Sequence, residues 1–199
     1  MNTATRQKIV MTALELFWAK GYQSTSISDI LSRSQVHSGS LYHFFPGKQD
    51  VLVAVLELYR DCIEDMLFAQ AWTGVEDPKE RIFALLDGYR AQLVSSDFMY
   101  GCPIGGLALE LHEPDPRVRN LLAVNFANWV GGVEQCLEQM DDRLPADTDR
   151  RALAEFILTI MEGAIMQART HRDIGHFDRN VAVLRTHFDA LERTARETI

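Results

Sequence analysis

Apolar residues recur at three- and four-residue spacing along most of the chain, which is the period of an α-helix. No stretch shows convincing alternation of apolar and polar residues, so the pattern predicts an all-α protein. The predicted helices cover residues 6–20, 26–34, 38–45, 48–70, 78–95, 103–111, 116–140, 149–170 and 177–198.

Local signals support the ends of the first three helices. Gly21 favours the left-handed backbone conformation that ends many helices, so it should end the first. Ser26 and Asp29 have the spacing of a capping box at the start of the second. Pro46 ends the third, because the residue before a proline avoids helical geometry. The helix from residue 48 to 70 would be roughly 34 Å long, enough to connect two bodies.

Composition limits the class of protein. The chain has 199 residues, of which 47% are apolar and 24% charged, as expected of a globular protein. We find no uninterrupted apolar span and no signal peptide, so we expect a cytoplasmic protein. Three scattered cysteines, Cys62, Cys102 and Cys136, predict reduced thiols and neither a disulfide framework nor a zinc site.

The charge is distributed unevenly. The chain carries a net charge of −8, which alone argues against a nucleic-acid binder. Residues 1–50 nevertheless hold five Lys and Arg against three Asp and Glu, a balance of +2, so the remainder carries −10. The positive potential therefore lies at the N-terminal end.

Three short helices, the second and third joined by a tight turn, are typical of a helix-turn-helix. The stretch SGSLYHFFPGK would supply the recognition helix, with small hydroxyls that permit close approach to DNA and with Tyr42 and His43 reaching further. The alternative is an aromatic cluster that only packs a small helical bundle. Spacing alone leaves both interpretations open.

The stretch ATRQKIVMTALELFWAKGYQSTSISDILSRSQVHSGSLYHFFPGKQDVL resembles the N-terminal domain of the TetR family of transcriptional regulators. It contains A-x-G-Y at the end of the first helix, TS before the second, and G-x-L-Y-x-x-F-x-x-K across the third. The resemblance implies a DNA-binding domain at residues 1–47 and a larger ligand-binding and dimerisation domain at residues 48–199. It also implies a ligand-responsive regulator, usually a repressor, that acts as a homodimer.

Matching positions to this motif assigns contacts with DNA to Thr25, Ser26, Ser38, Ser40, Tyr42, His43 and Lys48. Lys48 matches a lysine that contacts the DNA backbone, and Gly39 matches a small residue that lets the helix come close. Gln35 and His37 depart from the family pattern, which usually has glycine and a serine-like cap there. These two residues would add contacts peculiar to this protein's operator.

The block GCPIGGLALELHEPDPRVRNLL is similar to one in a TetR subgroup that often responds to small, hydrophobic or reactive compounds. Pro103 suits the first position of a helix, which puts Cys102 at its N-terminus, where a thiolate is favoured. One hypothesis is therefore a thiol sensor of electrophiles or oxidants. The alternative is a small buried cysteine that fills space.

A non-covalent ligand site would combine polar groups with aromatic side chains. The candidates are Tyr89, Phe98, Cys102, His112, Asn125, Asn128, Trp129, Met161 and Met166. The last two predicted helices, 149–170 and 177–198, have broad apolar faces, and the resemblance implies that they pair with a second chain. Such a dimer would hold its recognition helices about 34–36 Å apart and would favour a near-palindromic operator.

Other functions are less well supported by the sequence. The six histidines show no metal-ligand spacing, and no P-loop, GxSxG or GxGxxG motif occurs, so we expect neither an enzyme nor a bound cofactor or metal. A helical adaptor that binds other proteins would account for the acidic C-terminal part but not for the N-terminal motif.

Overall fold

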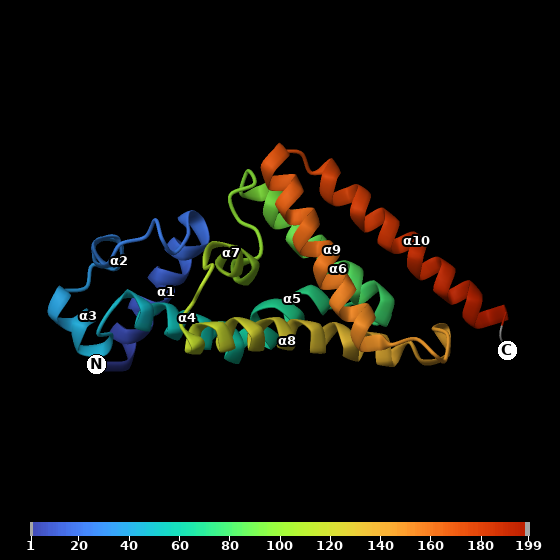
Figure 1. The fold of residues 1–199 in the computed structure, drawn as a ribbon, viewed down its shortest axis with the longest axis horizontal. Helices are drawn as coiled ribbons and strands as arrows, with labels where there is room; N and C mark the ends of the chain where they lie inside the picture. The colour runs from blue at the N-terminus through green and yellow to red at the C-terminus, as the bar shows by residue number, and fades with distance from the viewer. Residues whose placement is uncertain (1, 198–199) are drawn as a thin grey trace. The chain divides into compact units, whose positions relative to one another are not determined.

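The computed structural model describes residues 2–197, and residues 1, 198 and 199 lie outside it. Every regular element within the described range is a helix, so the predicted all-α class is confirmed (Figure 1). The main helices are α1 (Asn2–Lys20), α2 (Ile27–Ser34), α3 (Ser38–Phe44), α4 (Lys48–Ile63), α5 (Ala69–Trp72), α6 (Pro78–Ser95), α7 (Pro103–Glu110), α8 (Pro116–Gln139), α9 (Arg150–His171) and α10 (Gly175–Glu197).

Apart from the single helix predicted at 48–70, the predicted helices match these closely, and Thr198, the predicted end of the last one, lies outside the described residues. A short 3-10 turn, Asp141–Arg143, was not predicted. None of the described helices combines the length and apolar character needed to cross a membrane.

The helix ends follow from local backbone chemistry. Gly21 has a φ of 88°, the left-handed geometry expected of a helix stop. The Ser26 and Asp29 capping box is present, each side chain bonding to the other residue's backbone N–H. Gln35 ends α2 at a φ of 53°, which explains in steric terms why a glycine suits this position. His37 begins α3 without a side-chain cap.

The chain folds as two compact units. The first contains the chain up to Cys62 together with Pro103–Phe126, and the second contains Ile63–Cys102 and the described residues from Ala127 onward. The segment from 103 to 126 joins the first unit because it packs there, for example through a 3.0 Å hydrogen bond from Asn125 to the carbonyl of Leu56. The predicted functional division after residue 47 stays a prediction.

The first unit is built around the inner faces of its helices. Most of the apolar residues at the predicted spacing in α1 are buried, and α1 packs against α2 and α3. Leu41 is fully buried and Phe45 is 3% exposed, so their prediction as core residues is confirmed. The side chains that form this core include Ile9, Ala13, Phe17, Ile30, Leu41, Phe45, Val51, Leu52, Val55 and Leu56.

The predicted single helix 48–70 is interrupted by a π-helical turn, Glu64–Phe68, between α4 and α5. Phe68 is buried and stacks on Trp72 with ring centroids 4.6 Å apart. A Cβ placed on Gly132 of α8 would lie 2.4 Å from the Phe68 ring, so only glycine allows this close approach. The π turn thus accompanies a tight aromatic contact in the second unit.

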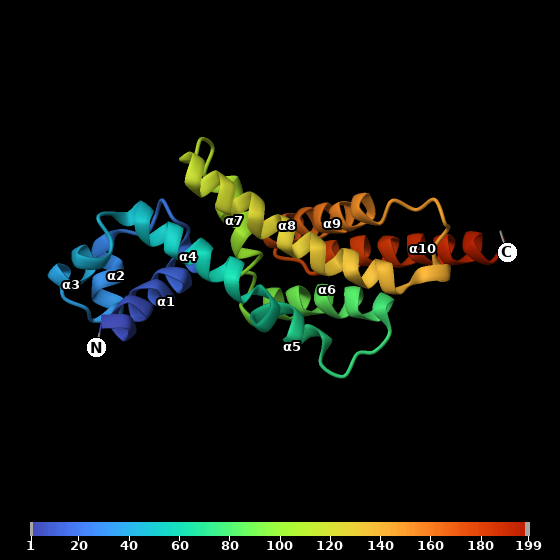
Figure 2. The same ribbon diagram turned by 90° about the horizontal axis from the view of Figure 1, so that it is seen from below.

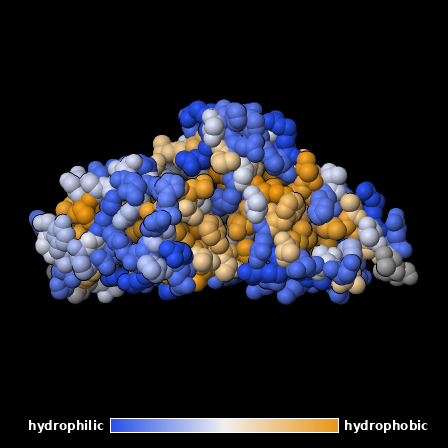
Figure 3. Space-filling view, in the orientation of Figure 1, coloured by the Kyte–Doolittle hydropathy of each residue, from blue (hydrophilic) through white to orange (hydrophobic). Residues whose placement is uncertain are grey.

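In the second unit, α9 and α10 form an antiparallel pair that lies side by side in both ribbon views (Figures 1 and 2). Ile157 and Met161 of α9 and Leu184 and Phe188 of α10 are fully buried, and the Phe188 ring lies edge-on to Phe83 of α6. Apolar side chains also reach the surface among charged ones over the part of the space-filling view that α6 to α10 occupy (Figure 3).

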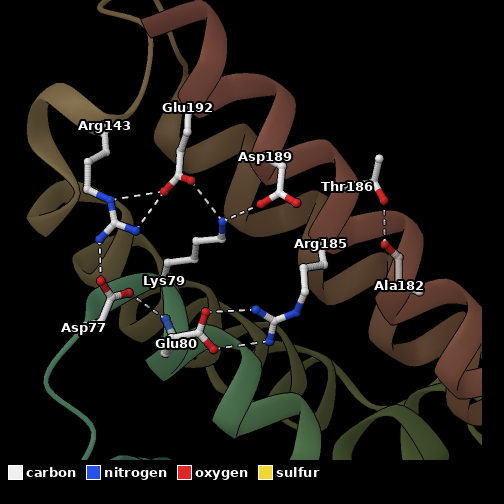
Figure 4. Close-up of polar contacts among 9 residues, drawn as sticks. All are labelled: Asp77, Lys79, Glu80, Arg143, Ala182, Arg185, Thr186, Asp189 and Glu192. Atoms are coloured by element: carbon white, nitrogen blue, oxygen red, sulfur yellow. Dashed lines mark hydrogen bonds and ion pairs between the residues drawn. The ribbon is translucent and has the colours of Figure 1, made fainter. Parts of the chain in front are cut away.

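A network of charged side chains ties α10 to α6 and to the 3-10 turn (Figure 4). Lys79 is only 7% exposed, and its ammonium lies 2.7 Å from Asp189 and 3.0 Å from Glu192. Arg143 bridges Glu192 at 2.7 Å and Asp77 at 2.6 Å. Because the buried ammonium has two carboxylate partners, the charge costs less to bury than an unpaired one would.

Candidate functional site

The outer face of α3 presents polar and aromatic side chains to solvent. Tyr42 is 55% exposed although it is a large aromatic residue, and the inward residue next to it, Leu41, is fully buried. The predicted contact residues that share this exposure are Gln35, His37, Ser38, Tyr42 and His43, whereas Ser40 is half-buried. Six of the nine residues predicted to contact DNA therefore lie on α3 or in the turn before it, and five of these six are exposed.

Gly39 lies on the same face with open space around it. A Cβ built on Gly39 would meet no described atom within 4 Å. Nothing inside the chain therefore requires glycine here, although glycine is a poor helix former. Because glycine has no side chain, no atoms protrude from the surface of α3 at this position.

Thr25 and Ser26 have structural roles at the start of α2. Thr25 is fully buried, and its hydroxyl donates a 2.7 Å hydrogen bond to the carbonyl of Gly21. The Ser26 hydroxyl lies 2.8 Å from Asp29 Oδ2, and the Ser26 backbone N–H donates to the same oxygen at 2.7 Å. That backbone bond, with a smaller contribution from Lys20, lowers the pKa of Asp29 to about 2.

Lys48 is half-buried and its ammonium faces inward. Nζ donates hydrogen bonds to the carbonyls of Tyr22 at 2.9 Å and Thr25 at 3.0 Å. It also lies 4.2 Å from the centroid of the Tyr22 ring. The predicted DNA contact of Lys48 remains a prediction, and the structure adds an internal role that the sequence did not reveal.

A second candidate site lies in the second unit, where three predicted ligand-binding residues come together. Tyr89, Cys102 and Trp129 are 7%, 8% and 4% exposed. Burial raises the pKa of the Tyr89 hydroxyl well above its usual value, with further contributions from Cys102 and Glu162. Trp129 acts on the same hydroxyl in the opposite direction, so the groups that influence Tyr89 are Cys102, Glu162 and Trp129.

Glu162, one residue after Met161 on α9, was missed by sequence reasoning. Burial raises the pKa of its carboxyl group, and a hydrogen bond with Cys102 opposes this shift. Its Oε1 is buried without a hydrogen-bond partner among the described residues, and so is Trp129 Nε1. The indole N–H is near Tyr89, but it makes no bond of normal geometry. The only sequence signal was a lone glutamate beside an apolar stripe.

We call Tyr89, Cys102, Trp129 and Glu162 the polar cluster. The other predicted ligand residues differ in their burial. Met161 is fully buried, Phe98 and Asn128 are half-buried, and His112 is exposed. Met166 is 52% exposed. Asn125 lies in the first unit, where its amide donates to the carbonyls of Leu56 and Leu121 at 3.0 and 2.8 Å. Its amide nitrogen is therefore committed to packing.

The segment before Cys102 is fixed against α9. A Cβ on Gly101 would lie 2.7 Å from Ile165, so glycine permits a close approach of the two backbones. Arg169 donates 3.2 Å hydrogen bonds to the carbonyls of Phe98 and Met99. Cys102 is thus held in position directly before the first residue of α7.

Comparison with known proteins matches residues 9–55 to the family described as bacterial regulatory proteins, tetR family. Residues 78–182 match the C-terminal domain of LmrA/YxaF-like transcriptional regulators. The HTH-type transcriptional regulator Rv0196 of Mycobacterium tuberculosis is 33% identical over 178 residues, which cover 87% of this chain and 88% of that protein.

Two further relatives extend over almost the whole chain. The HTH-type transcriptional repressor DhaR of a Mycobacterium species is 26% identical over 96% of this chain and 93% of its own length. The crystal structure of a regulatory protein TetR from Rhodobacter sphaeroides has a TM-score of 0.80 at 27% identity and covers 89% of this chain and 95% of that one.

The polar cluster predicts a pH-dependent stability. Since the folded protein raises the pKa of Glu162 above 4.5, it binds more protons than the unfolded chain above that pH, and its stability falls as pH rises. Glu162→Gln should therefore raise the midpoint of thermal unfolding at about pH 8 and have less effect at about pH 5.

Glu138→Gln, a change at an exposed position of α8, serves as the matched control and should leave the pH dependence unchanged. A loss of stability in Glu162→Gln at both pH values would show instead that the ionised carboxylate supports the fold.

Proposed function

The chain belongs to the TetR family of bacterial regulatory proteins, and we propose that it acts as a dimer that binds a near-palindromic DNA operator and releases it when a small molecule binds the second unit. Its relatives are transcriptional regulators, and DNA binding is the function that they share with it. The relative DhaR is a repressor, which supports repression here. Binding to chromosomal DNA would place the protein in the cytoplasm.

The observation that carries DNA binding is the exposed face of α3 around Gly39. Its small hydroxyl side chains and its open glycine let the helix approach a duplex closely. Tyr42 and His43 would reach phosphates or base edges. A face that only packed a bundle would bury Tyr42, which is more than half exposed.

Lys48 and Thr25 would support this surface from behind. An ammonium has three N–H donors, and the internal carbonyls use two, so the third remains for a phosphate oxygen. The buried hydroxyl of Thr25 would act through the turn that it closes. Ser26 is exposed at the start of α2 and would contact the DNA backbone more directly.

The polar cluster is our proposed ligand site. An indole N–H and a carboxylate oxygen without partners leave one donor and one acceptor buried, and each costs about 1–3 kcal/mol if nothing satisfies it. A small molecule with a carbonyl for Trp129 and a hydroxyl or amine for Glu162 would remove both penalties. Phe98, Asn128 and Met161 would contribute the surrounding contacts.

A thiol response is a second candidate, favoured by the hydrogen bond between Cys102 and Glu162. A carboxylate beside a thiol can accept its proton while the sulfur attacks an electrophilic carbon. With a maleimide, the new S–C bond forms at one alkene carbon and the thiol proton ends on the other. The added group would occupy the polar cluster as a ligand would.

The exposed faces of α9 and α10 support the proposed dimer. Phe156 and Met166 on α9 are 48% and 52% exposed, and Val183 on α10 is 70% exposed. A Cβ on Gly163, between the two α9 residues, would meet no described atom within 4 Å. Exposed apolar side chains around a glycine, which lets another helix come close, form a surface suited to pairing with a second copy.

Release of DNA needs a difference in affinity between two states of the dimer. Moving occupancy from nearly full to nearly empty takes about 5.5 kcal/mol of differential binding. Satisfying two buried polar groups, together with apolar contacts around them, can supply a free energy of that order. The ligand would therefore favour the state in which the recognition helices no longer match the operator.

Gly39→Ala tests the DNA-binding surface, because it should increase the stability of the protein but weaken its binding to DNA. The alanine should raise the free energy of unfolding by up to about 1 kcal/mol, because it is the better helix former and meets no clash. It should weaken binding to an operator selected from random duplexes at least tenfold, as should Tyr42→Ala. Fluorescence anisotropy across a salt series would give the affinities.

Wild-type affinity should fall steeply with salt, at about −0.9 in log K per log salt for each neutralised phosphate. A protein-binding adaptor would show no selected duplex and no such slope. An unchanged affinity in Gly39→Ala would mean that α3 does not approach the duplex at this point.

Phe156→Glu tests the dimer. A carboxylate buried in a two-fold interface meets its own copy, so dissociation should increase at least tenfold, measured by light scattering after size exclusion. Val94→Glu makes the same change at a 50%-exposed position of α6 and should leave the dimer intact. A wild-type monomer, or a Phe156→Glu dimer as stable as wild type, would contradict the assignment.

Cys102→Ser tests the thiol response. N-Ethylmaleimide should abolish operator binding by the wild type within the time that Cys102 becomes labelled, as followed by peptide mass spectrometry. Binding by Cys102→Ser should survive the same treatment. Equal inactivation of both proteins would assign the effect to Cys62 or Cys136, and Cys102 would then be a packing residue.

A further inference from the structure

The turn between α1 and α2 is held by two side chains of opposite charge. The Glu110 carboxylate accepts hydrogen bonds from the backbone N–H of Tyr22 at 2.8 Å and of Gln23 at 2.6 Å. The Lys48 ammonium bonds to the carbonyls of Tyr22 and Thr25 on the same turn. Each charged group thus bonds to two backbone groups of the turn, and the Tyr22 carbonyl also accepts from the Thr25 N–H at 3.2 Å.

Gly21 makes the carboxylate contact possible. Its φ of 88° turns the next two N–H groups toward Glu110, and a Cβ at this position would lie 2.9 Å from Oε2. Any other side chain would be strained and would push the carboxylate away. The glycine and the glutamate, 89 positions apart in the chain, therefore form one structural unit.

The turn determines where the DNA-binding helices begin. The Thr25 hydroxyl bonds to the carbonyl of Gly21 at 2.7 Å, and Ser26 directly after it caps α2. A shift of Tyr22 and Gln23 would therefore move the first turn of α2. Since α2 and α3 are joined by three residues only, α3 would follow.

Glu110 also ends the helix that starts beside the polar cluster. α7 is a single short helix, about 12 Å long, that begins at Pro103 immediately after Cys102. Cys102 directly precedes Pro103 in the chain, so no loop separates it from this helix, and a displacement of Cys102 would act directly on the first residue of α7. Two charge-assisted bonds at its far end would transmit the movement to the backbone of the DNA-binding part.

We propose that Glu110, at the end of α7, is the residue that couples the second unit to the recognition helix. It does so by accepting hydrogen bonds from the Tyr22 and Gln23 backbone N–H groups. The coupling rests on the proposed ligand-controlled DNA binding, but the contact itself can be tested without DNA. Glu110 is a positioning residue in this scheme, because it touches neither DNA nor ligand.

The test uses Cys102→Phe, which enlarges the side chain before α7, in place of an effector. NMR hydrogen exchange of the Tyr22 and Gln23 amides is the readout. In an otherwise wild-type protein, Cys102→Phe should change their exchange rates at least fivefold. Glu110→Gln should raise these rates at least tenfold, and adding Cys102→Phe to it should change them less than twofold.

Glu113→Gln, at an exposed glutamate three residues further on, is the matched control and should respond to Cys102→Phe as the wild type does. Glu110→Asp, which keeps the charge but shortens the reach, replaces Glu110→Gln if that variant does not fold. Cys102→Met similarly replaces Cys102→Phe. An equal response in Glu110→Gln and wild type, or no response in wild type, would overturn the coupling role.

Operator binding separates this proposal from the proposed function. Cys102→Phe should weaken binding at least tenfold in the wild type and less than threefold when combined with Glu110→Gln, because without the Glu110 carboxylate a displacement of α7 would no longer reach the turn. If the wild type bound no selected duplex, the proposed function would fail, and the exchange measurements would still decide the role of Glu110. Tenfold weakening in both backgrounds would refute the coupling while leaving the regulator in place.

Discussion

The DNA-binding unit depends on how the backbone of one five-residue turn, Gly21 to Thr25, is satisfied. A turn has no ladder of its own, and each buried N–H or C=O without a partner costs free energy comparable to a lost hydrogen bond. Here the partners are charged side chains from α4 and α7, so the mutual placement of α1 and α2 rests on Lys48 and Glu110. Local sequence starts and stops these helices, while residues distant in the chain bond to the turn that joins them.

The second unit treats its buried polar groups in two different ways. Lys79 is almost completely buried, and two carboxylates satisfy its ammonium, with Arg143 completing the network around Glu192. Trp129 and Glu162 in contrast each keep a buried polar atom without a partner. The satisfied network holds α10 onto α6, and the unsatisfied pair lowers stability. In the ligand response that we propose, a molecule that satisfied both atoms would recover this free energy on binding.

Most of the fold was predictable because helix signals are local. Pro78, Pro103 and Pro116 each begin a helix as the sequence predicts, and the outward face of α3 follows from the inward positions of Leu41 and Phe45. The π turn at Glu64–Phe68 was not predictable, because its close contact is with Gly132, far along the chain. The roles of Lys48 and Glu110 were not predictable for the same reason. The sequence places both residues on helices but cannot show that both point at one turn.

Asn125 and Glu162 show why a ligand site is harder to predict than a DNA-binding surface. Both are polar residues on mainly apolar helices, and both keep a buried side-chain oxygen without a hydrogen-bond partner among the described residues. Their other contacts distinguish them: the Asn125 amide nitrogen donates to two carbonyls of the first unit, while Glu162 lies beside Cys102 in the second. The surroundings of Glu162 support the ligand site that we propose. Whatever satisfies Glu162 acts beside the residue that precedes α7, and α7 ends on the turn that starts α2. In the proposed mechanism, a ligand at the polar cluster would therefore act through α7 on the turn that precedes the DNA-binding helices.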